Sequence, residues 1–180
     1  MEFVDKSIEV NADIRDVYDA WTAFEDFPTF MEVVERVDVL PDDSLHWVAV
    51  IEDDIIEWDA DMVEHIPEQS VSWEARDGRE TGKVTFEKIG TNQTKVHYQL
   101  DYDPEAWDGD PQEIADWMST RVSDALDAFK GLVEEDAYGS LDDAGKGTDS
   151  EKRRVPSSPP RPSSPWWFRP RRTRHEQDVA

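Results

Sequence analysis

Apolar and polar residues alternate along several short segments of the N-terminal half of the chain. In residues 56–62, IEWDADM, four apolar side chains alternate with three acidic ones, so the two kinds point to opposite sides of an extended chain. Turn-forming segments such as PDDS and RDGRETG separate these runs, which favours antiparallel pairing of neighbouring strands. The alternation predicts strands over residues 3–10, 35–40, 45–51, 56–62, 70–75, 83–89 and 94–102.

Between the first two predicted strands the apolar spacing becomes helical. Residues 14–21, IRDVYDAW, place their apolar side chains on one helical face, and either Asn11 or Asp13 can cap this helix. Aromatic residues then follow at three-residue intervals, and Pro28 interrupts a single straight helix. The segment therefore predicts one helix to about Ala23, a bend and a second short helix. We expect its four rings to surround the mouth of a curled sheet: Trp21, Phe24, Phe27 and Phe30.

A long apolar stripe with a period of 3.6 residues follows the last predicted strand. It runs from Gln112 to about Glu135, roughly 36 Å of helix, and requires a broad apolar surface to cover it. The inward face of the sheet is that surface, and a twisted sheet of this size curls. The pattern predicts an α+β fold, in which a curled antiparallel sheet of about seven strands wraps around a long C-terminal helix, with two short helices after the first strand.

A helix lying in a curled sheet leaves a space between the two layers, where we expect the functional site. Each inward-facing residue is also compatible with simple core filling, but several aromatic side chains together suit an apolar pocket with few polar groups. Arg121 lies close to the apolar stripe, where it can reach a ligand oxygen or a surface carboxylate. The predicted ligand-cavity residues are Trp58, Met62, Trp73, Phe86, Tyr98, Trp117, Met118, Arg121 and Phe129.

Composition divides the chain into a domain over residues 1–138 and a tail over residues 139–180. The tail is rich in Pro, Ser and Arg and nearly free of aliphatic residues, so we expect it to be disordered. It also contains Trp166, Trp167 and Phe168 among basic residues. This composition is compatible with an inert extension, with contact to a membrane interface or nucleic acid, or with association with the acidic domain. The composition of the tail identifies no specific partner for it.

Charge and cysteine content narrow the class of protein. Residues 1–139 carry 37 Asp and Glu residues against 10 Lys and Arg residues, a net charge of −27, so we expect no nucleic-acid binding by the folded domain. An acidic surface of this kind is also compatible with a high-salt habitat. The chain has no cysteine, no signal-like N-terminus and no apolar run near 18 residues. We therefore expect a cytoplasmic protein without stable membrane insertion.

No catalytic or metal-binding motif is recognisable. The four histidines are scattered without metal-ligand spacing, and the sequence contains no GxSxG, P-loop or GxGxxG motif, so we expect no metal and no cofactor. Glu57, Asp59 and Asp61 recur on one strand face, where like charges can raise one another's pKa. They lie on the face opposite Trp58, away from the expected cavity, so a solvated outer face is the favoured interpretation. No catalytic residue is assigned from the sequence.

Several segments, in order, resemble a known superfamily. SIEVNADIRDVYDAWTAFEDFPTFMEVVERV, LHWVAVI, EWDADMVEHIPEQSVSWEARDG, GKVTFEKI and TKVHYQLDYDPEAW are similar to START-like SRPBCC proteins, specifically the bacterial polyketide cyclase/dehydrase or coenzyme Q-binding-like branch. The resemblance covers about residues 2–135. It implies a helix-grip fold with a hydrophobic cavity for a lipid, isoprenoid or polyketide-like ligand, and it implies no particular reaction.

Three functions are compatible with these observations. The first is binding of a hydrophobic small molecule between sheet and helix. The second is a polyketide cyclase or aromatase-type enzyme of the cyclase/dehydratase kind, in which Tyr98 or Arg121 assists proton transfer in the same cavity. The third is an adaptor that acts through its basic aromatic tail.

Overall fold

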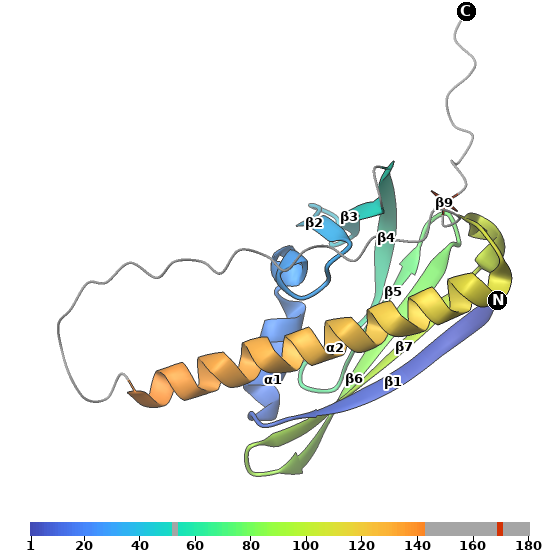
Figure 1. Ribbon diagram of the computed structural model, residues 1–180. Helices are drawn as coiled ribbons and strands as arrows, with labels where there is room; N and C mark the ends of the chain where they lie inside the picture. Colours follow the sequence, from blue (N-terminus) through green and yellow to red (C-terminus); the bar gives the residue numbers. More distant parts are fainter. Residues whose placement is uncertain (52–53, 143–168, 171–180) are drawn as a thin grey trace, which may run out of the picture.

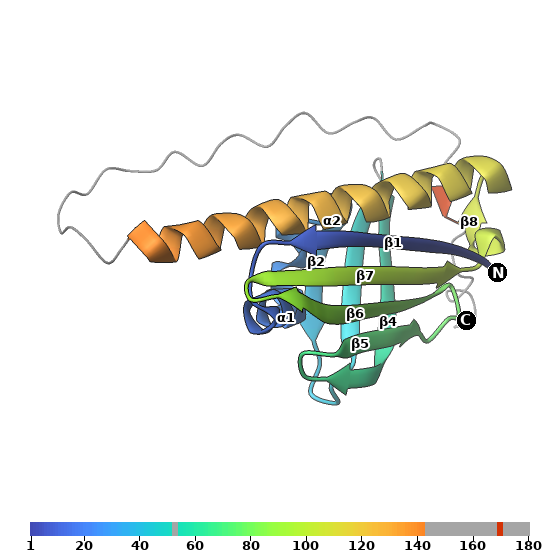
Figure 2. The same cartoon turned by 90° about the horizontal axis from the view of Figure 1, so that it is seen from below.

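Seven antiparallel strands form one curled sheet in the computed structural model, which describes residues 1–51, 54–142 and 169–170 (Figures 1 and 2). The strands follow the order β1-β7-β6-β5-β4-β3-β2, so only the pairing of β1 with β7 joins elements distant in sequence. The predicted α+β helix-grip fold is confirmed. The strands are β1 (Glu2–Val10), β2 (Val34–Val39), β3 (Leu45–Ile51), β4 (Asp54–Ile66), β5 (Ser70–Ala75), β6 (Glu80–Gly90) and β7 (Gln93–Tyr102).

Two helical segments connect β1 to β2. Helix α1 (Ile14–Thr22) begins after Asp13, whose carboxylate accepts a hydrogen bond from the Arg15 backbone N–H at 3.1 Å. The 3₁₀ helix η1 (Phe24–Thr29) follows and contains Pro28. The expected bend therefore lies at Ala23, where the backbone leaves the helical conformation.

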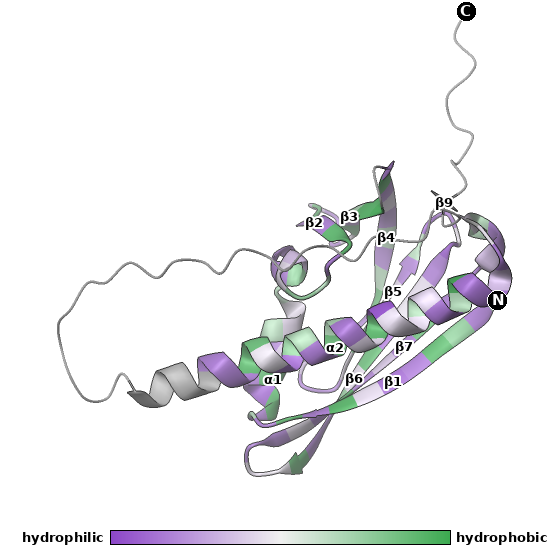
Figure 3. Ribbon diagram, viewed as in Figure 1, coloured by the Kyte–Doolittle hydropathy of each residue, from purple (hydrophilic) through white to green (hydrophobic). Residues whose placement is uncertain are grey.

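Helix α2 (Pro111–Asp142) lies across the concave side of the sheet and runs alongside β1 (Figures 1 and 2). Apolar residues recur along the helix among hydrophilic ones (Figure 3). The hydrophobic side chains Ile114, Val122 and Phe129 are buried. Helix α2 ends at Asp142, seven residues beyond the predicted end near Glu135, so the helix extends past the apolar stripe. A short 3₁₀ helix, η2 (Pro104–Ala106), connects the sheet to this helix.

The predicted domain boundary at residue 138 falls inside α2. Beyond the helix, strand β9 (Arg169–Pro170) pairs with β8 (Trp107–Asp108), so two residues of the predicted tail contact the domain. The remaining tail residues, 143–168 and 171–180, lie outside the described residues. The prediction of disorder and the Trp166–Phe168 segment both concern these residues. In the described part of the chain, no helix combines the length and apolarity needed to span a membrane.

An aromatic cluster forms the centre of the core. The Trp21 ring lies 4.9 Å from the Phe129 ring, 5.5 Å from Phe30, 5.6 Å from Tyr98 and 5.8 Å from Phe27, measured between ring centroids. Most of these pairs are edge-to-face, the arrangement that the charge distribution of aromatic rings favours. The cluster therefore joins α1, η1, β7 and α2.

Trp73 on β5 lies directly opposite Gly82 on β6. A Cβ atom at position 82 would lie 2.3 Å from the nearest atom of the Trp73 indole, a distance that packed atoms do not adopt. Glycine is therefore required for the ring to rest against the β6 backbone.

Candidate functional site

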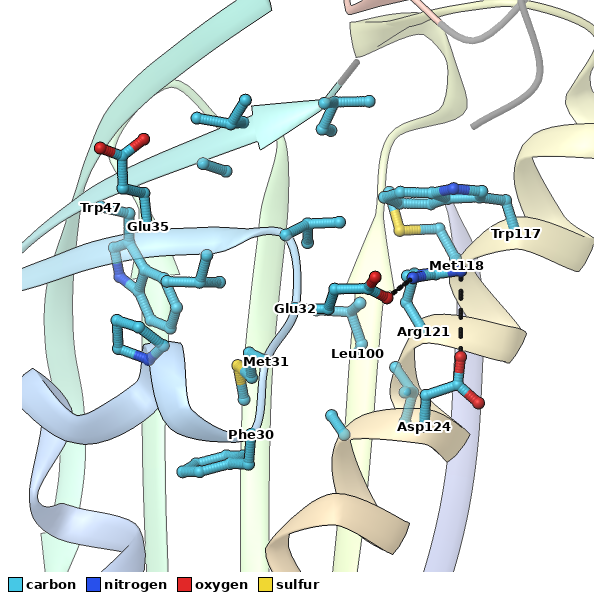
Figure 4. A pocket seen from close by; sticks show the side chains of 18 of the residues that line it. Phe30, Met31, Glu32, Glu35, Trp47, Leu100, Trp117, Met118, Arg121 and Asp124 are labelled. Carbon is cyan, nitrogen blue, oxygen red and sulfur yellow. Dashed lines mark hydrogen bonds and ion pairs between the residues drawn. The ribbon is translucent and has the colours of Figure 1, made fainter. Parts of the chain in front are cut away.

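A cavity of about 670 Å³ separates part of α2 from the half of the sheet formed by β2, β3 and β4 (Figure 4). Its size lies within the range typical of small-molecule sites, roughly 300–1,000 Å³. The lining is mainly apolar, with contributions from η1, from β6 and β7 and from the first half of α2. The cavity therefore lies in the space where helix and sheet do not fill each other.

Five of the predicted site residues line this cavity. Trp58 reaches it from β4, and Trp117, Met118 and Arg121 reach it from successive turns of α2. Phe30, expected at the mouth, lines it from the end of η1 (Figure 4). These residues come from distant parts of the sequence, so the fold brings them together.

Five other predicted cavity residues lie outside the lining, because the aromatic core fills that part of the concave face. Tyr98 and Phe129 contact Trp21, and Phe86 packs edge-to-face on Tyr18 at 5.4 Å. Trp73 is 1% exposed and covers Gly82, and Met62 lies opposite it on β4. The inward orientation of these residues was predicted, but the cavity begins farther along the strands. The residues concerned are Met62, Trp73, Phe86, Tyr98 and Phe129.

Three rings expected at the mouth are instead part of the core. Trp21 and Phe27 are fully buried, and Phe24 packs on Phe27 with a centroid distance of 5.4 Å. The bend at Ala23 turns η1 back toward α1, so the rings contact one another rather than surround an opening. Of the four, only Phe30 reaches the cavity.

Glu80, the first residue of β6, lines the cavity and was not identified from the sequence. Burial raises the pKa of its carboxyl to about 7, and the nearby Trp73 indole, the Arg79 charge and the Trp58 indole oppose this effect only in part. The Trp58 and Trp73 N–H groups are buried without completing a hydrogen bond of ordinary geometry. The carboxyl therefore titrates near neutral pH, without a hydrogen bond of ordinary geometry from either indole.

A sequence signal for Glu80 exists. The residue is in phase with Gly82, Val84 and Phe86 along β6, the inward-facing side of that strand. Because Glu80 lies within the turn-forming segment RDGRETG, the predicted strand begins three residues later, at Lys83. Extending the alternation backward would place this carboxyl inside.

Arg79 is beside Glu80 in sequence but is engaged elsewhere. Its guanidinium forms an ion pair with Asp77 at 2.7 Å and lies 5.2 Å from the Trp58 ring centroid and 5.8 Å from that of Trp107. Among the described residues, no cationic side chain lies within 4 Å of the Glu80 carboxylate oxygens. The charge of Glu80 is therefore not neutralised by a direct ion pair.

Arg121 extends from α2 toward the loop after η1. Its Nη1 donates a hydrogen bond to Glu32 at 2.6 Å, its Nη2 lies 3.9 Å from Asp124, and its guanidinium lies 5.7 Å from the Trp117 ring centroid (Figure 4). Of the two roles predicted for Arg121, the structure contains the one with a carboxylate. This pair links the two walls of the cavity.

The acidic strand face predicted from the sequence lies outside the cavity. Asp61 accepts a hydrogen bond from Arg76 at 2.6 Å, and Asp59 lies 2.7 Å from a ring nitrogen of His46. Within the described ranges, no group of three or more His, Asp or Glu side chains is placed to hold a metal ion.

Sequence comparison identifies relatives over the folded part of the chain. The model of the family described as "Polyketide cyclase / dehydrase and lipid transport" matches residues 10–128. An uncharacterized 17.2 kDa protein of Streptomyces lincolnensis is 34% identical over 137 residues, which cover 75% of this chain and 91% of that protein.

Solved structures share the fold. The Zhui aromatase/cyclase from Streptomyces sp. R1128 superposes with a TM-score of 0.63 at 12% identity, over 74% of this chain and 93% of that one. A START superfamily protein from Mycobacterium smegmatis gives the same TM-score at 16% identity, over 74% and 97% of the respective chains. The family match and the Streptomyces lincolnensis relative together show that this chain belongs to the polyketide cyclase/dehydrase and lipid transport family.

Proposed function

We propose that the protein binds a hydrophobic small molecule, of lipid, isoprenoid or polyketide type, in the cavity between the sheet and α2. The observation that carries this proposal is the cavity of about 670 Å³ with a mainly apolar lining. Transfer of a ligand into it contributes about 25 cal/mol for each Å² of apolar surface removed from water. The family description, which includes lipid transport, supports the same class of ligand.

Filling the cavity tests this function. Ala125 lines the cavity from α2, so Ala125→Trp places an indole in the space that the ligand would occupy. We expect the neutral apolar dye Nile red to bind the unmodified protein saturably, and the variant to bind it at least about tenfold more weakly. Fluorescence titration measures both affinities.

Asp127→Trp is the matched control, because Asp127 is an exposed residue of the same helix and does not line the cavity. This variant should retain the dye affinity of the unmodified protein. Circular dichroism establishes that both variants are folded. Equal dye affinity in the folded Ala125→Trp variant would place binding elsewhere and contradict the proposal.

A second function, catalysis by a cyclase or aromatase-type enzyme, is favoured by one observation. The cavity contains a carboxyl, Glu80, with a pKa of about 7, and burial together with this nearby charge raises the pKa of the Tyr98 phenol. A carboxyl that titrates near neutral pH suits a general acid or base. Tyr98 lies outside the cavity lining, so Glu80 replaces it as the candidate for proton transfer.

Incubation with a lipid extract separates the two functions. We expect native mass spectrometry to detect a ligand that the protein retains and that is chemically identical to a compound in the extract. A product that accumulates with the unmodified protein and not with Glu80→Gln would instead favour the enzyme.

A further inference from the structure

The ionisable groups that line the cavity are mainly acidic. Four carboxylates contribute to the lining, from Glu32, Glu35, Glu80 and Asp124, whereas Arg121 is the one basic residue in it among the described residues. The Arg121 guanidinium already interacts with two of these acids, at 2.6 and 3.9 Å. A ligand with an anionic head group would therefore meet uncompensated negative charge.

Glu80 differs from the other three acids in its surroundings. Glu32, Glu35 and Asp124 are exposed, whereas the Glu80 carboxyl is closely surrounded by protein and its remaining accessible surface borders the cavity. None of the described cations forms an ion pair with it. The Arg79 charge offsets the burial of this carboxylate only in part, and a cation brought by the ligand would offset more of that cost.

Tryptophan rings provide the apolar wall of the cavity beside Glu80. Trp47, Trp58, Trp107 and Trp117 all line the cavity, and Trp47 and Trp58 stack with an interplanar angle of 7°. The Arg79 guanidinium lies against the Trp58 and Trp107 rings and the Arg121 guanidinium against the Trp117 ring, so the charged part of the site is the Glu80 carboxyl rather than the ring faces. The same rings accept the apolar body of an amphiphile.

We propose that the cavity selects amphiphiles carrying a protonated amine, with Glu80 as the counter-ion and the tryptophan rings as the apolar wall. This inference rests on the proposed function, because it names the class of ligand that the same cavity takes. A neutral alcohol of equal length binds through its apolar part alone, and a carboxylate of equal length is disfavoured.

Proton release on binding is an independent test of the pairing between the ligand's ammonium group and Glu80. The Glu80 carboxyl, with a pKa of about 7, is roughly half protonated at neutral pH, and an ammonium group beside it favours the charged form. Binding of the amine should therefore release a fraction of a proton per ligand. Calorimetry in buffers with different ionisation enthalpies measures this release.

The test compares decylamine, decanol and decanoate by isothermal titration calorimetry at about pH 7, in roughly 0.5 M salt to screen the acidic surface. We expect decylamine to bind at least about tenfold more tightly than decanoate. Glu80→Gln should remove most of this preference and the proton release, and should change decanol affinity less than about twofold. Glu74→Gln, which alters an exposed acid of β5, should leave all three affinities unchanged.

The outcomes are distinguishable. Decanol binding without a preference for the amine, or a preference that persists in folded Glu80→Gln, would overturn this inference and leave the proposed function intact. Failure of all three probes to bind, together with absence of Nile red binding, would overturn both.

Discussion

Trp21→Ala is expected to lower the free energy of unfolding by about 3–5 kcal/mol, the range for loss of a buried aromatic side chain. Trp21 is fully buried, and its ring contacts four other rings, two from η1 and the residue that caps it, one from β7 and one from α2. Neighbouring aromatic rings relax poorly into the space left behind, so both burial and packing are lost. A loss of this size is a large part of the stability of an ordinary domain, about 5–15 kcal/mol.

Urea denaturation followed by tryptophan fluorescence and circular dichroism measures this change. Trp117→Ala is the matched control, because Trp117 is only partly buried and borders the cavity. We expect it to cost less than about 2 kcal/mol, since the removed ring already faces unfilled space. Equal losses in the two variants would mean that the Trp21 cluster is not the main packing centre.

Glu80→Gln is expected to stabilise the protein at alkaline pH. The pKa of Glu80 rises from its ordinary value of 4.5 to about 7 in the folded state, so between these values the folded protein binds more protons than the unfolded chain. Stability therefore falls as pH rises through this window. The penalty is absent below pH 4.5 and complete above about pH 7.

The size of this penalty is on the order of 2–3 kcal/mol, because each pKa unit corresponds to about 1.4 kcal/mol and the carboxyl keeps some surface open to the cavity. Urea denaturation of the variant and the unmodified protein should give similar stabilities near pH 4.5 and a gap that widens to about pH 8 in favour of the variant. Glu74→Gln should show no such widening, because this acid is exposed. If the free energies of unfolding of Glu80→Gln and of the unmodified protein changed in parallel with pH, the raised pKa of Glu80 would be contradicted.

Most of the architecture was predictable from the spacing of apolar residues. Alternation identified all seven strands of the main sheet, and the change to a period of 3.6 residues identified α2. The ends of helices and strands were harder to predict. Strand β4 continues four residues beyond Met62, and α2 continues past Glu135, because backbone hydrogen bonding does not stop where the apolar pattern stops.

The cavity was predictable in kind but not in position. Periodicity indicates which side of a strand faces inward, and Trp58 and Trp73 were both placed correctly on that side. It does not indicate where along the strand the core ends, which depends on how α1 and η1 fold over the sheet. Trp73 therefore lies in packed core, whereas Trp58 borders the cavity.

The contact between Trp73 and Gly82 has a consequence for acid–base behaviour. The indole atoms nearest to the Gly82 position adjoin the ring nitrogen, whose N–H opposes the rise in the pKa of Glu80. A side chain at residue 82 would require the indole or the β6 backbone to shift, and a shift of the indole would move that dipole. The ionisation of the cavity carboxyl consequently depends on a residue that has no functional group of its own.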